Sequence, residues 1–137
     1  MAILVDTGVL LGAIDADDND HHAAAGALDR YIGELLVPVT VIAETAWQLE
    51  RNVGPDAEAD FLDAIVSGEL IAVDLTPADY QRAGQLIRQY STLHLGLVDA
   101  SLIAIAERME ITTIATLDKR HFTVVRPAHC SAFELIP

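Results

Sequence analysis

The chain has 137 residues, a length that favours one domain spanning 1–137 with a single buried core. Hydrophobic residues make up 52% of it and charged residues 21%, which excludes both a disordered chain and a membrane-spanning segment. The net charge of −13 argues against a general nucleic-acid-binding surface, although residues 76–137 are neutral, with six basic side chains against six acidic ones.

Two features of the sequence indicate a cytoplasmic protein. The apolar run at residues 1–5 follows no basic residue and stops at Asp6, so it lacks the form of a secretory signal. The single cysteine, Cys130, cannot form a disulfide within the chain or a cysteine-based zinc site. We therefore expect a reducing compartment and no membrane association.

The first half of the chain alternates short apolar runs with stretches of helical periodicity. Asp20 and Thr40 stand where helix N-caps are expected, and Gly54-Pro55 separates two helices. In chain order we predict a strand at 1–5, helices at 8–14 and 21–33, a strand at 35–39, and helices at 40–51 and 56–66.

The second half continues the same alternation. Thr76 and Pro77 provide an N-cap and a first helical residue. In chain order we predict a strand at 70–73, helices at 77–90 and 98–109, and strands at 111–115 and 122–125.

This pattern favours an α/β fold. Strands that alternate with helices form a mainly parallel sheet, because each helix carries the chain back across it. We expect a three-layer α/β/α architecture with a central sheet of about five strands. Ligands bind at the carboxyl edge of such a sheet, so polar residues that follow strands are candidates for a functional role.

Three acidic residues are expected near that edge. Asp6 ends the first strand, Glu44 lies one turn into the helix after the second strand, and Asp118 follows the strand at 111–115. Each also has a structural explanation: a helix N-cap for Asp6, a first-turn acid favoured by the helix dipole for Glu44, and an ion-paired turn for Asp118.

Asp99 is harder to explain structurally. It shares one side of its predicted helix with Leu95 and Leu102, and no basic residue lies within one turn of it. Burying an ionised carboxylate without a partner costs several kcal/mol. A metal ion would compensate for that cost, and the alternative is a buried base such as Arg88 or Arg126.

Four carboxylates at one edge would form a site of hard oxygen ligands. Such ligands favour Mg²⁺ or Mn²⁺ over zinc, and the site suits phosphodiester hydrolysis. A phosphatase on a related three-layer fold is an alternative. Haloacid-dehalogenase-like phosphatases would place a second Asp two residues after Asp6, where Gly8 stands. A receiver domain would have adjacent acids before its first helix, and this chain lacks them.

The four acids lie in four short segments: Asp6-Thr7-Gly8-Val9-Leu10, Val41-Ile42-Ala43-Glu44, Leu97-Val98-Asp99-Ala100 and Thr116-Leu117-Asp118-Lys119-Arg120-His121-Phe122. In order and spacing these segments resemble the PIN-domain ribonucleases, and more narrowly the VapC toxins of bacterial type II toxin–antitoxin systems. The resemblance covers essentially the whole chain. It departs at Gly8, where many relatives have Ser or Asn, and we do not expect this to remove metal binding.

The resemblance implies a PIN fold and a Mg²⁺- or Mn²⁺-dependent endoribonuclease. It assigns the acidic metal site and catalysis to Asp6, Glu44, Asp99 and Asp118. It also implies that Thr7 and Thr116 are polar neighbours of the ion or its waters. Apart from the resemblance, Lys119 and Arg120 are candidates to contact RNA phosphate, and their alternative is pairing with nearby acids.

The partners implied by the resemblance are RNA, a second copy in a homodimer, and a VapB-like antitoxin. That antitoxin would be a small DNA-binding protein whose C-terminal segment lies in a groove near the site, so DNA would be contacted only indirectly. A noncatalytic PIN-like binding module is the alternative. The sequence does not indicate which RNA is cut, or any role for His21, His22 and the acidic loop from Asp15 to Asp20.

Overall fold

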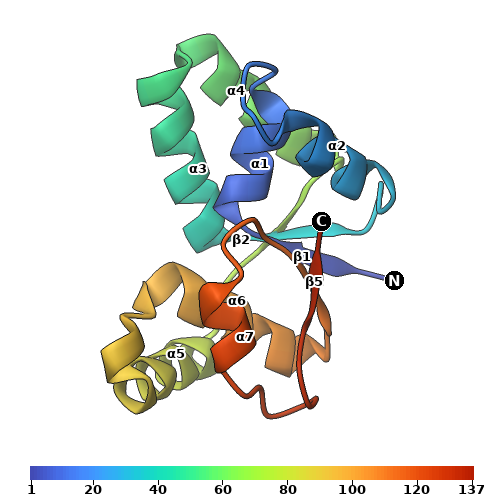
Figure 1. Ribbon diagram of the computed structural model, residues 1–137. Coiled ribbons are helices and arrows are strands. Elements are labelled where there is room, and N and C mark those ends of the chain that lie inside the picture. Colours follow the sequence, from blue (N-terminus) through green and yellow to red (C-terminus); the bar gives the residue numbers. More distant parts are fainter.

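The centre of the fold is a five-stranded parallel sheet. The computed structural model describes all 137 residues and orders the strands β3-β2-β1-β4-β5 (Figure 1). Leu4 in the central strand pairs with Leu36 on one side and with Ile114 on the other. The strands are β1 (Ile3–Val5), β2 (Leu35–Pro38), β3 (Ile71–Val73), β4 (Thr113–Ala115) and β5 (Glu134–Ile136).

Helices cover both faces of this sheet. The first four lie on one face and the last three on the other, as Figure 1 shows, so the predicted three-layer α/β/α fold is confirmed. None of the helices combines the length and the apolar content needed to cross a membrane. The helices are α1 (Thr7–Ile14), α2 (His21–Asp29), α3 (Val39–Asn52), α4 (Pro55–Val66), α5 (Pro77–Gln89), α6 (Gly96–Met109) and α7 (Arg120–Val124).

The core lies between the sheet and its two helical layers. All three residues of β1 are fully buried, as expected for a central strand with a helical layer on each face. Helix α6 buries seven consecutive residues, 100–106, because it packs both on the sheet side and against α5. The first turn of α6 is therefore held rigidly at the carboxyl edge of the sheet.

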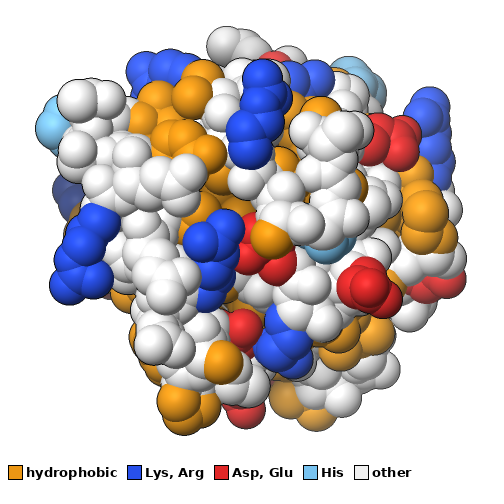
Figure 2. All heavy atoms as spheres, turned by 90° about the horizontal axis from the view of Figure 1, so that it is seen from below, with side chains coloured by type: hydrophobic (Ala, Val, Ile, Leu, Met, Phe, Trp, Pro, Cys, Tyr) orange, Lys and Arg blue, Asp and Glu red, His pale blue; other side chains and the backbone are white.

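The face formed by α5–α7 carries most of the basic side chains. Figure 2 shows Lys and Arg side chains spread over this face around a smaller group of acidic ones. Arg82 pairs with Glu107 at 2.6 Å, and Arg108 pairs with Asp79 at 3.0 Å. These acidic partners explain why the second half of the sequence is neutral rather than basic.

One predicted strand is wrong. Residues 122–125 were expected to be extended, but α7 covers most of this segment. The helix and the residue that ends it bury Phe122 and Val125, which stand three residues apart. The Phe122 ring packs edge-on against the Phe133 ring, with 6.4 Å between the ring centroids. The fifth strand is instead β5, which pairs with β4. Unlike the other strands, β5 offers no apolar run in the sequence, because Glu134 begins it and Pro137 follows it.

The predicted helix starts are only partly correct. Helix α3 begins at Val39, one residue early, and the Thr40 hydroxyl bonds Ser101 at 2.6 Å instead of capping α3. Asp20 stands at the N-cap of α2 but makes no capping hydrogen bond. The helix predicted at 21–33 ends at Asp29, because the chain turns before Gly33, whose φ is +85°.

Thr76 does cap α5, and this gives a test of the local structure. Its hydroxyl accepts from the Asp79 amide at 3.2 Å, and the Asp79 carboxylate accepts from the Thr76 amide at 2.9 Å. We expect Thr76→Ala to lower the free energy of unfolding by about 1 kcal/mol, measured by urea denaturation. Thr76→Ser keeps the hydroxyl and should stay close to the wild type; equal losses in both variants would contradict the capping role.

Candidate functional site

Asp6 lies at the centre of the candidate site. It follows β1 directly and caps α1: one carboxylate oxygen accepts from the Thr7 amide at 2.8 Å. The other oxygen accepts from the Thr116 hydroxyl at 2.9 Å. Thr116 follows β4, the parallel neighbour of β1, so the sheet topology brings these two residues together. Asp6 is 9% exposed.

Glu44 reaches the same place from the other side of β1. It lies in the second turn of α3, which follows β2, and its carboxylate accepts from the Thr7 hydroxyl at 2.7 Å. Thr7 therefore contacts both acids, through its amide with Asp6 and through its hydroxyl with Glu44. The hydroxyl groups of the two threonines expected beside the site each donate to one of its carboxylates.

Asp99 meets a partner that the sequence analysis did not find. Its carboxylate forms a short hydrogen bond with Nδ1 of His121, which lies in α7 and is 8% exposed. Neither Arg88 nor Arg126 forms an ion pair with it, so these two residues are wrong as its partners, and the buried base that meets Asp99 is His121 instead. The one feature of the sequence that could have indicated this contact is that His121 stands three residues after Asp118.

Asp118 lies at the exposed rim. Its side chain is 64% exposed and lies 3.8 Å from the Arg120 guanidinium. Its backbone carbonyl accepts from the Thr116 hydroxyl at 3.1 Å, which ties this turn to the Asp6 contact. Lys119 donates to the Pro137 carbonyl at 2.7 Å, whereas the Arg120 side chain is 72% exposed. The ion-paired turn considered for Asp118 is therefore present.

The electrostatics show that the acids act on one another. Burial raises the pKa of Asp6 from 3.8 to about 6; the Thr7 amide opposes the rise, and the charges of Asp99 and Glu44 add to it. Burial likewise raises the pKa of Asp99; its bond to His121 opposes this rise, whereas the charges of Asp118 and Glu44 add to it.

The oxygen atoms of the site's side chains are suitable ligands for a hard divalent cation. Carboxylate and hydroxyl oxygens are ligands that Mg²⁺ and Mn²⁺ accept, and a cation would relieve the mutual repulsion of the acids. As the side chains stand, no three His, Cys, Asp or Glu groups converge closely enough to hold an ion. Asp6, Glu44 and Asp99 each bond a donor within the chain instead.

The other candidates make only local contacts. His21 bonds the Gly12 carbonyl through Nδ1 at 2.9 Å. In the acidic loop, the Asp15 and Asp18 carboxylates accept from amides two residues later, which makes them turn-forming residues. At Gly8 a Cβ atom would lie 3.8 Å from Leu117, an ordinary contact, so packing does not force the departure from the family pattern.

The PIN domain family matches residues 3–126. This chain is a PIN-domain protein. It is 32% identical over 135 residues to Ribonuclease VapC26 of Mycobacterium tuberculosis, covering 98% of the chain and all of that protein. The resemblance drawn from the four acidic segments is therefore confirmed.

Solved structures share the PIN fold of this chain. VapC20 of Mycobacterium tuberculosis, a Sarcin-Ricin loop cleaving toxin, superposes with a TM-score of 0.77 at 20% identity, over 82% of this chain and 87% of that one. A toxin–antitoxin complex from Klebsiella pneumoniae superposes with a TM-score of 0.72 at 15% identity, over 99% of this chain and 97% of that one. VapBC2 of Rickettsia felis, bound to promoter DNA, superposes with a TM-score of 0.70 at 16% identity, over 98% of this chain and 97% of that one.

The raised pKa of Asp6 predicts how stability depends on pH without metal. The folded protein binds this proton more tightly than the unfolded chain, so the contribution favours folding below pH 4 and is lost as the pH rises through about 6. A pKa rise of this size corresponds to a contribution of about 3 kcal/mol to the free energy of unfolding. We expect Asp6→Asn to flatten the fall, measured by urea unfolding in EDTA between pH 4 and 7.5.

A matched control keeps this test specific. Asp17→Asn changes an exposed acid of the loop and should leave the slope of the wild type unchanged. An Asp6→Asn protein whose stability falls with pH as steeply as the wild type would show that Asp6 does not carry the effect.

Proposed function

We propose that this chain is a metal-dependent endoribonuclease and the toxin of a toxin–antitoxin pair, with residues 1–137 acting as one PIN domain. The observation that carries the proposal is that Asp6, Glu44 and Asp99 stand at the same edge of the sheet, near enough for the charges of Glu44 and Asp99 to raise the pKa of Asp6. Similarity to a ribonuclease over the whole chain supports it. The family match also favours a nuclease over a phosphatase.

The chain's own residues divide the work of hydrolysis. Bound Mg²⁺ or Mn²⁺ would supply a nucleophilic water and neutralise charge on the scissile phosphate. Asp6 would bind the ion as a buried ligand and Asp99 as a half-buried one, and Asp118 would complete the site from the rim. Glu44 would bind the ion or orient the attacking water. Thr7 and Thr116 hold the carboxylates through their hydroxyl groups.

RNA would meet the site at its exposed rim. Arg120 is the exposed cation beside the acids, and Lys119 precedes it on the same turn. Phosphate contacts of this kind position a strand without reading its sequence. They also let a chain of net charge −13 bind RNA through a small local region.

Cleavage by a variant at Asp99 tests the catalytic proposal. We expect Asp99→Asn to lose at least about 100-fold in Mn²⁺-dependent cleavage of total cellular RNA, because an anionic ligand is removed. The metal-free variant should hold or gain stability, because a buried charge disappears. Asp17→Asn should cut like the wild type. A destabilised Asp99→Asn protein that still cuts RNA would end the assignment, and a wild type that binds metal but cuts nothing would favour the noncatalytic module.

Metal binding should also stabilise the fold. A ligand that binds only the folded state at about 100 times its Kd adds about 2.7 kcal/mol of stability. We expect millimolar Mn²⁺ to raise the Tm of the wild type, measured by thermal melting against an EDTA sample. The shift should disappear in Asp6→Asn. A wild-type Tm that Mn²⁺ leaves unchanged would count against the metal site.

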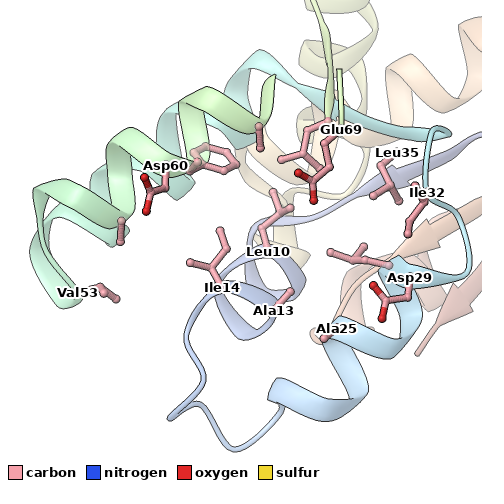
Figure 3. A pocket seen from close by; sticks show the side chains of 15 residues that line it. Leu10, Ala13, Ile14, Ala25, Asp29, Ile32, Leu35, Val53, Asp60 and Glu69 are labelled. Carbon is pink, nitrogen blue, oxygen red and sulfur yellow. The ribbon is translucent and has the colours of Figure 1, made fainter. Parts of the chain in front are cut away.

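An apolar cavity of about 460 Å³ offers a docking site for the antitoxin. It lies between α1, α2 and α4, and twelve of its fifteen lining residues are hydrophobic. Figure 3 shows Leu10, Ile14, Ile32 and Leu35 around it, with acidic side chains at its margin. Those acids are Asp29, Asp60 and Glu69.

We propose that the C-terminal segment of a VapB-like antitoxin occupies this cavity. The solved neighbours include toxin–antitoxin complexes, which supports a protein occupant. An apolar segment with flanking basic residues would match both the floor and the acidic margin. DNA contact would then come only through the antitoxin, and the pair would act in the cytoplasm.

A charge placed in the cavity tests this docking. Ile14→Glu should weaken binding of the cognate antitoxin at least about tenfold by calorimetry while leaving RNA cleavage intact, because Ile14 lines the cavity and is 38% exposed. Val66→Glu is the matched control, since Val66 is exposed on α4 and does not line the cavity. Equal binding by both variants would place the antitoxin elsewhere.

We also propose a homodimer. Large apolar side chains remain exposed on three helices: Trp47 on α3, Tyr80 on α5 and Leu97 on α6. Exposed apolar side chains of this size are enriched at interfaces between protein subunits. Light scattering of the purified chain would give its mass directly.

A further inference from the structure

We propose that His121 is a positioning residue for Asp99: its Nδ1–H group fixes the orientation of that carboxylate, so that the site binds its cation without first ordering Asp99. The inference rests on the proposed metal-dependent function. It concerns a residue of α7 that the four acidic positions do not include.

The contacts of the acids set Asp99 apart. Asp6 has two donors and Glu44 has one, and all of them come from Thr7 and Thr116, which lie next to strand ends. The Asp99 carboxylate has a single hydrogen-bond partner within the chain, and that partner is His121. Without this bond, no hydrogen bond within the protein would orient the Asp99 carboxylate.

The imidazole is itself held firmly in place. His121 is 8% exposed, and its neighbour Phe122 is 2% exposed and packs edge-on against Phe133. The His121 carbonyl also accepts from the Val125 amide at 3.1 Å. The core therefore fixes α7, and α7 fixes the donor that Asp99 meets.

A histidine suits this position better than the basic residues beside it. An imidazole can donate through Nδ1 without carrying a permanent charge, whereas Lys or Arg would place a permanent cation where the metal must bind. Lys119 and Arg120 precede His121 directly, but their charged groups are directed to Pro137 and Asp118. Groups that hydrogen-bond a metal ligand typically contribute about 10–100-fold to metal affinity.

Three substitutions at His121 test the atom responsible. The amide nitrogen of Asn is as many bonds from Cα as Nδ1 is, and that of Gln is one bond further away. We expect His121→Asn to bind Mn²⁺ within about threefold of the wild type, and His121→Gln and His121→Leu to bind at least about tenfold more weakly. Calorimetry without RNA measures the affinity. In cleavage assays at fixed Mn²⁺, His121→Gln and His121→Leu should have a lower kcat than the wild type and the same KM for RNA. Added Mn²⁺ should restore their kcat.

A second variant in α7 separates positioning from folding. Phe122→Leu loosens the same helix from the core but leaves the Nδ1 donor in place. It should lower the Tm of the metal-free protein at least as much as His121→Leu does, yet weaken Mn²⁺ binding much less, because the donor itself remains. If Phe122→Leu weakens Mn²⁺ binding as much as His121→Leu does, the role is merely structural and the proposal is wrong.

The remaining outcomes distinguish this inference from the proposed function. A wild type that binds Mn²⁺ and cuts RNA, together with a His121→Leu protein that binds Mn²⁺ equally well, would overturn the inference alone. A wild type that binds no Mn²⁺ would overturn both. Weak binding by His121→Gln with recovery in His121→Asn would establish the donor at Nδ1.

Discussion

The burial of Asp6 beside two other carboxylates is the constraint on which the rest of the site depends. Burial and the charges of Asp99 and Glu44 favour its protonated form, while the Thr7 amide and Thr116 hydroxyl favour the carboxylate. The balance leaves a group that holds its proton until about pH 6. Such a site lowers the stability of the metal-free fold, and the divalent cation that we propose would offset that cost on binding.

The strand order brings the site residues together. Because β1 lies between β2 and β4, its carboxyl end adjoins the segments that leave both of these strands: α3 with Glu44 after β2, and Thr116 after β4. Asp99 comes from the first turn of α6, whose next seven residues are buried. These three acids therefore extend from the ends of regular elements at one edge of the sheet.

The sequence predicted the acids better than it predicted their partners. An acid directly after a buried strand, like Asp6, can be placed at the sheet edge from topology alone, and Asp99 stands out as a charge on an apolar helix side. His121 could not be found this way, because its contact with Asp99 depends on α7, a five-residue helix in a segment expected to be a strand. Thr40 failed as a cap for a related reason: its tertiary contact with Ser101 overrides local preference.

Helix α1 joins the edge that carries the candidate site to the cavity that we propose for the antitoxin. Its first residue, Thr7, bonds both Asp6 and Glu44, and its last, Ile14, lines the cavity. Seven residues of helix span about 10 Å, a distance that about three extended residues of a bound segment would cover. A partner seated in the cavity can therefore reach the carboxylates by continuing along α1. Masking the site in this way requires no change in the fold, since one short, rigid helix already forms part of both regions.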